Sequence, residues 1–238
     1  MRPSILRRVV AEFSGTLLLL AAVVGSGIMG ERLAAGNVAI ALLANCIATG
    51  GALIAIILAF GPVSGAHLNP VVTLTHAWLK GIPWCETPAY LSAQVVGAFA
   101  GVAVAHLMFK LPVFTVSTRI RNGGPQVFSE FIATFGLMAV IWGCARSRPH
   151  VVPFGVGAYI TAAYWFTGST SFANPAVTLA RSLTNTFSGV RPIDVPAFVA
   201  AQLAGAFSAT LLFRWLMPRL AAHAPDVMVK QRESQRQP

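Results

Sequence analysis

Hydrophobic residues in this chain form long runs with very little charge, instead of the narrow apolar stripes of a soluble helix. The runs lie at 10–29, 38–60, 87–109, 127–145, 151–168 and 195–217. A helix needs roughly 20 mostly apolar residues to cross a bilayer, and each run is close to that length. We therefore predict an all-α membrane protein with six transmembrane helices.

Two further apolar segments, near 69–79 and 174–186, are too short to cross a bilayer. Each opens with Asn-Pro, in "AHLNPVVTL" and "SFANPAVTL". Proline is favoured at the first helical position and asparagine just before it is a strong N-cap, so this dipeptide indicates a helix start. The Gly-, Ser- and Thr-rich stretches before both dipeptides predict non-helical backbone, which membrane proteins tolerate only where protein covers it or where it lines a watery cavity. We predict two re-entrant half-helices.

The chain repeats one unit twice. "AEFSGT" (11–16) is echoed by "SEFIAT" (129–134), and "AQVVGAFAG" (93–101) is echoed by "AQLAGAFSA" (201–209), in the same order around the Asn-Pro segments. Because three spans per unit is an odd number, the second unit must be inverted in the membrane. Inverted repeats place central sites at the repeat interface near the midplane. The two half-helices should therefore meet with their N-termini facing each other, around a pore.

These echoes divide the chain into a first repeat at 1–110, a connecting loop at 111–126 and a second repeat at 127–224. The polar tail at 225–238 is expected to be a disordered cytoplasmic end. Eleven of the 17 Lys and Arg fall on the side of both termini. This bias predicts that both termini are cytoplasmic. We also expect the protein to lie in the inner (plasma) membrane.

Composition limits the possible functions further. The chain is 55% hydrophobic and 10% charged, whereas a soluble domain has about 25% charged residues. The net charge of +10 does not indicate a nucleic-acid partner, because the basic residues do not gather on one face. The three cysteines lack metal-ligand or redox spacing, and the sequence has neither a phosphate-binding loop nor a nucleophile–base pair. We expect no enzymatic activity, no cofactor and no metal.

The doubled Asn-Pro boxes, the two glutamate-bearing helices and the inverted repeat together resemble the aquaporin (major intrinsic protein) family over nearly the whole chain. Asn69, Pro70 and Val71 resemble the first box of that family, with Val71 in place of alanine. The second box is matched by Asn174, Pro175 and Ala176. The resemblance implies six tilted helices, two half-helices, one pore in each subunit and a homotetramer embedded in the lipid bilayer.

The resemblance also implies a selectivity filter at four places along the chain. These are Thr49 or Gly50, the segment from Ile160 to Ala162, Ser171 and Val177. Family members carry arginine directly after the second box, where this chain has Val177. Because none of the candidates is aromatic or charged, we expect a wider and less polar constriction than in a strict water channel. The alternative is that Phe166 or Phe172 narrows it.

Arg181 lies four residues after Val177, on the same helix face and about 6 Å further along the axis. Three interpretations are open for this arginine: a displaced filter cation, a vestibule charge that attracts oxyanions, or a structural residue that holds a loop.

Glu12 and Glu130 lie within predicted spans, where an ionisable group is a functional-site hypothesis by default. They are expected to support the loops before the Asn-Pro boxes, with proton coupling as the alternative. His67 is expected to support and line the pore, and a pH gate is the alternative.

The segment "STSFANPAVTLARSLTNTFSGVRP" is most similar to bacterial aquaglyceroporins associated with arsenical resistance. This similarity implies passive permeation by small neutral solutes: glycerol-like polyols, neutral trivalent or methylated arsenic species, and water. A strict water channel is the first alternative, and a proton-coupled transporter is the second, because broken helices in inverted repeats also build transporters.

Overall fold

The computed structural model describes residues 3–218, apart from the side chain of Ser147. All regular elements in this part of the chain are helical, which confirms the all-α prediction. The α-helices are α1 (Ile5–Leu33), α2 (Val38–Ser64), α3 (Pro70–Trp78), α4 (Thr87–Met108), α5 (Gly124–Ser147), α6 (Val152–Phe166), α7 (Pro175–Arg181) and α8 (Val195–Leu216). Short 3-10 turns, η1 (Trp84–Glu86), η2 (Pro149–Val151) and η3 (Pro192–Asp194), precede α4, α6 and α8.

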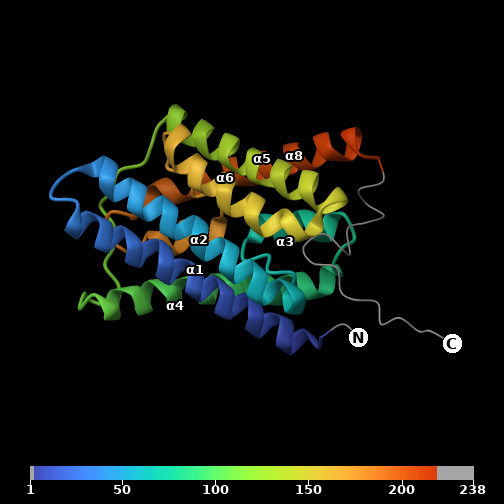
Figure 1. Cartoon of the computed structure of the whole chain (residues 1–238), viewed down its shortest axis with the longest axis horizontal. Helices are drawn as coiled ribbons and strands as arrows, with labels where there is room; N and C mark the ends of the chain where they lie inside the picture. Colours follow the sequence, from blue (N-terminus) through green and yellow to red (C-terminus); the bar gives the residue numbers. More distant parts are fainter. Residues whose placement is uncertain (1–2, 219–238) are drawn as a thin grey trace.

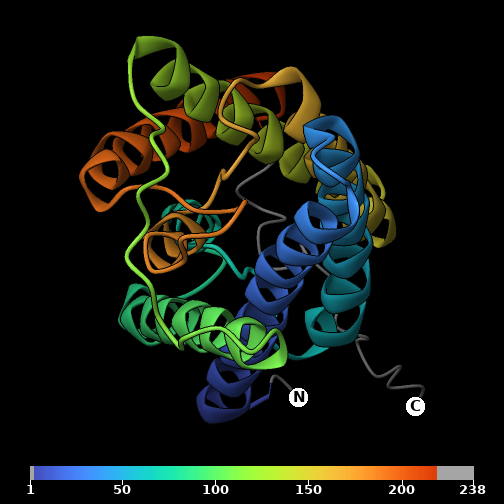
Figure 2. The same ribbon diagram turned by 90° about the vertical axis from the view of Figure 1, so that its left-hand side faces the viewer.

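Six long helices form a ring around the two short helices, α3 and α7 (Figures 1 and 2). Helix α1 begins and α8 ends at the same end of the bundle (Figure 1), here called the terminal end. The opposite end is called the far end. Helix α3 leads toward the start of α4 at the terminal end, and α7 leads toward the start of α8 at the far end. The two short helices therefore point away from each other.

Within residues 3–218, five helices are long and apolar enough to cross a membrane: α1, α2, α4 with η1, α5, and α8 with η3. The fifth predicted span, at 151–168, is shorter than expected, because α6 has only 15 residues. Helix α6 begins after the η2 turn and ends at Thr167, where the backbone becomes extended. The chain leaves the helix there in order to fold back into the centre of the bundle and reach α7.

Helix α7 ends at Arg181, five residues before the predicted limit of the second half-helix. The next residues turn outward because their carbonyls accept hydrogen bonds from the loop that joins the repeats. Thr115 donates its backbone N–H to the carbonyl of Leu183, and Ser117 donates to the carbonyl of Ser182. The first half-helix, α3, matches its predicted range within a residue at each end.

The two repeats pack their helices in the same way. Helix α1 packs against α4 in the first repeat, and α5 packs against α8 in the second. At both crossings a glycine lets the backbones approach: a Cβ on Gly97 would strike the carbonyl of Phe13, and a Cβ on Gly205 would strike the carbonyl of Phe131. Small residues at such crossings are typical of helix packing in membranes.

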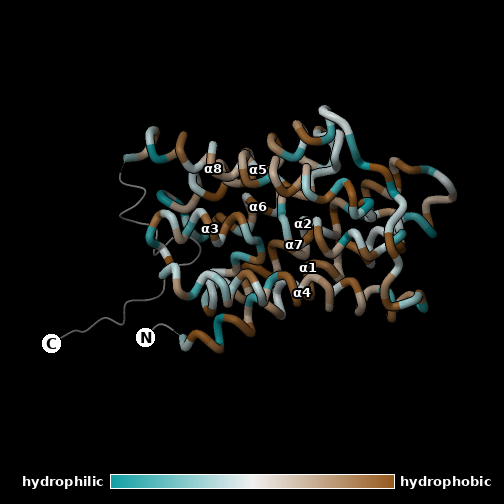
Figure 3. Tube along the Cα trace, turned by 180° about the vertical axis from the view of Figure 1, so that it is seen from behind, coloured by the Kyte–Doolittle hydropathy of each residue, from teal (hydrophilic) through white to brown (hydrophobic). Residues whose placement is uncertain are grey.

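The outer surface of the bundle is strongly apolar. Large hydrophobic side chains such as Leu18, Ile47, Val96, Phe128 and Trp215 are exposed on the long helices. Hydrophobic positions continue along the helices for most of their length (Figure 3). A soluble monomer rarely exposes apolar patches larger than a few hundred Å², so this surface is suited to lipid. The predicted cytoplasmic tail at 225–238 lies outside the described residues.

Candidate functional site

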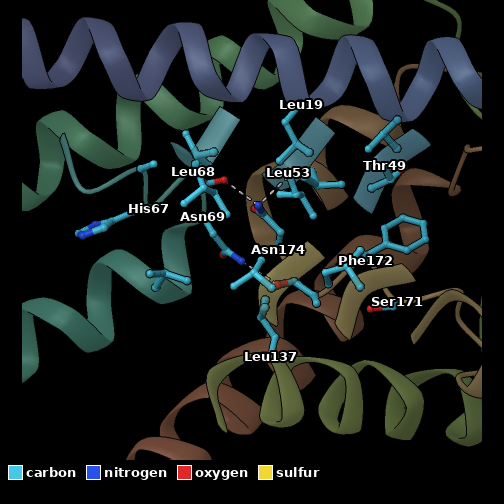
Figure 4. Close-up of a pocket in the computed structure, with 18 of the residues that line it drawn as sticks. Leu19, Thr49, Leu53, His67, Leu68, Asn69, Leu137, Ser171, Phe172 and Asn174 are labelled. Carbon is cyan, nitrogen blue, oxygen red and sulfur yellow. Dashed lines mark hydrogen bonds between the residues drawn. The ribbon is translucent and has the colours of Figure 1, made fainter. Parts of the chain in front are cut away.

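A narrow cavity lies along the centre of the bundle. Asn69 and Asn174 lie in its middle, with His67 toward one end and Thr49, Ser171 and Phe172 toward the other (Figure 4). Most of the remaining wall is aliphatic and comes from α1, α2, α5 and α6. An apolar cavity with a few convergent polar groups is the usual form of a small-molecule site.

The two asparagines begin the two half-helices. The side-chain oxygen of Asn69 caps α3 by accepting from the N–H of Val71, at 3.1 Å. The oxygen of Asn174 caps α7 by accepting from Ala176 and Val177, at 3.0 and 3.2 Å. These caps satisfy N–H groups that have no partner inside the helix.

Each asparagine amide also reaches across to the other repeat. Asn69 Nδ2 donates to the carbonyl of Ala173, and Asn174 Nδ2 donates to the carbonyl of Leu68, both at 2.8 Å. An amide nitrogen has two hydrogens, so one hydrogen on each asparagine remains for a molecule in the cavity. The centre of the cavity therefore presents a pair of fixed hydrogen-bond donors.

The loop before α3 is held by Glu12 of α1. Its carboxylate accepts from the N–H groups of His67 and Leu68, at 2.9 and 2.7 Å, and from the side chains of Ser64 and Gln94, at 2.6 and 2.8 Å. Glu12 is completely buried and does not line the cavity. These contacts agree with the interpretation that Glu12 supports the loop before α3.

Glu130 holds the loop before α7 in the same manner. Its carboxylate accepts from the N–H groups of Phe172 and Ala173, at 2.8 and 2.9 Å, and from Gln202 Nε2, at 2.6 Å. Both loops need this support because alternate residues adopt the left-handed region, which non-glycine residues seldom occupy. The φ values of these residues are 45° and 52° at Ala66 and Leu68, and 51° and 49° at Ser171 and Ala173.

The far end of the cavity combines hydroxyl groups with aromatic rings. Thr49 of α2 and Tyr164 of α6 share a hydrogen bond of 3.2 Å between their hydroxyls. The Ser171 hydroxyl is buried and has no hydrogen-bond partner within the described residues. Val177 and Phe172 complete this part of the wall. Phe166, in contrast, is 56% exposed and does not line the cavity.

Arg181 also lines the far end of the cavity, although its side chain is only 1% exposed. Its Nε donates to the carbonyl of Ser188, and its guanidinium carbon lies 3.4 Å from the centre of the Phe172 ring. The arginine therefore belongs both to the wall of the cavity and to the packing of the loop after α7.

At the terminal end, His67 lines the cavity and contacts α3. Its Nδ1 lies 3.1 Å from the Thr73 hydroxyl, and its Nε2 lies 2.8 Å from Nδ1 of His76. The His67 ring also lies 5.3 Å from the ring of Tyr90. The cavity is thus bordered at this end by buried and hydrogen-bonded imidazoles.

The structure brings only part of the predicted set to the cavity. The residues that line it are Asn69, Asn174, Thr49, Ile160, Ser171, Val177, Arg181 and His67. The box residues Pro70, Val71, Pro175 and Ala176 are buried beside it without lining it.

Two of the candidates, Gly50 and Ala162, do not line the cavity. Gly50 faces α6, where a Cβ would strike Thr161, and Ala162 lies on the exposed face of α6. Of the two phenylalanines named as the alternative, Phe172 lines the cavity and Phe166 does not, and Tyr164, which was not among the candidates, lines it as well. Tyr164 lies four residues after Ile160, so helical spacing was the available signal for it.

The sequence model of the Major intrinsic protein family matches residues 1–171 and 149–237 of the chain. The chain belongs to the major intrinsic protein family. Members of this family are integral membrane proteins, in agreement with the apolar helices and outer surface described above.

Several major intrinsic proteins are similar to this one. Aquaglyceroporin AqpS of Rhizobium meliloti (strain 1021) is 56% identical over 211 residues, which cover 89% of this chain and 90% of that protein. Aquaporin NIP1-4 of Oryza sativa subsp. japonica is 32% identical over 214 residues, covering 87% of this chain and 77% of the rice protein. Aquaporin NIP3-1 of the same plant is 34% identical over 184 residues, and the match spans 58% of its length.

The fold of this major intrinsic protein is also similar to a solved structure. The X-ray structure of the aquaglyceroporin from Plasmodium falciparum superposes with a TM-score of 0.75, covering 92% of this chain and 100% of that chain. The two sequences are 23% identical, so this likeness concerns the fold alone.

Proposed function

We propose that this major intrinsic protein is a passive channel for small uncharged solutes such as glycerol-like polyols, and that water passes too. One observation carries the proposal: the central cavity has a mostly aliphatic wall, and its few hydrogen-bonding groups are fixed along the length of the pathway. An aliphatic wall suits the carbon face of a polyol, while fixed donors and acceptors replace water on its hydroxyls. The name of the relative from Rhizobium meliloti, an aquaglyceroporin, supports the same substrate class.

Cations are disfavoured in such a pathway because they would lose their water without receiving a compensating negative charge. The two half-helices also present N-terminal, positively polarised ends to the centre, which opposes cations. We therefore propose that the solutes are neutral, and we include neutral trivalent and methylated arsenic species on the basis of the sequence of the second loop. The channel needs no covalent chemistry and no cofactor.

We further propose that both termini face the cytoplasm, that the protein lies in the inner (plasma) membrane and that four copies assemble. The distribution of Lys and Arg supports this orientation, and the far end of the cavity then faces outward. The family resemblance supports the tetramer.

A stopped-flow assay of the purified protein in liposomes tests the proposed function. Water, glycerol, arsenite and a methylated arsenical are compared as permeants, with protein-free liposomes as the control. We expect rapid glycerol flux that runs down its gradient and is insensitive to a protonophore. Rapid water flux without glycerol flux would support the strict water channel instead. Accumulation of solute against its gradient, abolished by a protonophore, would support a transporter.

A further inference from the structure

Arg181 is a buried guanidinium that has no carboxylate partner among the described residues. The side chain is 1% exposed, and within residues 3–218 it takes part in no ion pair. The carboxylate of Glu130 is already occupied by Phe172, Ala173 and Gln202. Because an uncompensated buried charge is costly, an arginine used only for packing would be poorly suited to this position.

Two contacts fix the guanidinium in place. Its Nε donates to the carbonyl of Ser188. Its central carbon, Cζ, lies 3.4 Å from the centre of the Phe172 ring, within the range of a cation–π contact. Phe172 is itself held, since its N–H is bonded to Glu130 and its ring packs edge-on against Phe198 at 5.3 Å. The guanidinium is therefore part of a rigid wall.

These contacts use only Nε and one face of the group. The two terminal nitrogens make no hydrogen bond to any residue in the described range, and Arg181 lines the cavity. The Ser171 hydroxyl, which is also unpartnered, lines the same part of the wall. Donors without acceptors at this end of the pathway require an oxygen-bearing molecule to satisfy them.

We infer that Arg181 is the specificity-determining cation of the far-end constriction, acting from one helical turn beyond Val177. Its positive charge excludes cations from the pathway, and its terminal nitrogens donate hydrogen bonds to the oxygens of a passing neutral polyol. This inference rests on the proposed channel function. It assigns to one residue the role that the sequence pattern alone left open among a filter cation, a vestibule charge and a loop support.

The decisive variants are Arg181→Met, Arg181→Lys and the double variant Val177→Arg with Arg181→Met. Arg119→Met is the matched control, because Arg119 belongs to the connecting loop, is exposed, pairs with Glu31 and does not line the cavity. Na⁺ conductance and water flux are measured for each variant. The quantity compared among the variants is the ratio of Na⁺ conductance to water flux. The parent is measured first; a parent that conducts neither water nor glycerol refutes the channel function and not the assignment of Arg181.

For Arg181→Met we expect the conductance ratio to rise by at least about tenfold, since the fixed charge that repels cations is gone. Arg181→Lys should raise the conductance ratio much less, because the lysine keeps the positive charge. In the double variant, Val177→Arg should restore cation exclusion, because it places a positive charge one helical turn before position 181. A ratio in Arg181→Met equal to that of the parent overturns the inference. A second result would also overturn the inference. If Arg181→Met and Arg181→Lys both lose water flux, and the double variant with Val177→Arg does not regain it, the arginine has a purely structural role.

Discussion

Asn69 and Asn174 each donate a hydrogen bond to the residue that precedes the other. The two bonds, Asn69 to the carbonyl of Ala173 and Asn174 to the carbonyl of Leu68, have the same length of 2.8 Å. They join the two half-helices directly at the centre of the cavity. Each asparagine therefore has three simultaneous tasks, which are to cap its own half-helix, to bind the opposite loop and to face the solute.

Asn174→Asp should both destabilise the protein and block polyol flux. The change removes the amide donor and places a carboxylate against the carbonyl of Leu68, which is left without its partner. An unsatisfied buried carbonyl costs about 1–3 kcal/mol. The midpoint of thermal unfolding in detergent and the glycerol flux in liposomes measure the two effects. Asn69→Asp should behave alike because its geometry is the same, and a difference between the two variants larger than the error would contradict this symmetry.

Glu12→Gln and Glu130→Gln should reduce stability while leaving transport passive. In both variants one carboxylate oxygen becomes an NH₂ group that faces donors, so at least one bond to the loop backbone is lost, at a cost of about 1–3 kcal/mol. Thermal unfolding checks the first effect. Solute uptake with and without a proton gradient checks the second, and a gradient dependence that the substitutions abolish would favour the proton-coupled alternative.

Val177→Arg should reduce glycerol flux more than water flux. The new side chain enters the far end of the cavity, where Val177 forms part of the wall, and it places a second guanidinium one turn from Arg181. We expect glycerol flux to fall by about tenfold and water flux by a smaller factor, because the narrower opening still admits the smaller molecule. Equal fluxes in variant and parent would show that position 177 does not limit passage.

Arg121→Met should loosen the loops that carry the far-end wall. The Arg121 guanidinium donates to the carbonyls of Ser169, Phe187 and Gly189, and burial lowers its pKa from the ordinary arginine value. Loss of these charge-assisted bonds should cost about 2–4 kcal/mol of unfolding free energy. The measurement is thermal unfolding beside Arg119→Met, an exposed arginine of the same loop that should change it little. Equal midpoints for the two variants would refute the role of Arg121.

Much of the central architecture could be predicted from the sequence because it depends on local chemistry. Asn-Pro indicates a helix start within an apolar run, and the doubled glutamates indicated which groups hold the two loops. The early end of α7 could not be predicted in this way. It depends on carbonyls that bond to Thr115 and Ser117, and these residues are far away in the chain.

The far-end wall was hard to predict for a related reason. Thr170, Ser171 and Ala173 have positive φ values, so side chains in this loop follow neither a helical nor a strand period. Sequence spacing therefore could not show that Phe172 faces the cavity and stacks on Arg181. The spacing of Val177 and Arg181 did place both on one face of a helix, but only the contact with Ser188 shows what fixes the arginine.

The reciprocal bonds of the asparagines also constrain the order of events during synthesis. Their partners are 104 and 106 residues apart in the chain. While the ribosome is still producing the second repeat, the first half-helix has no carbonyl from Ala173 to bind and no amide from Asn174 to receive. The first loop is therefore held only by contacts within its own repeat, such as those of Glu12, and the pathway closes into its final shape only when the last third of the chain has been inserted.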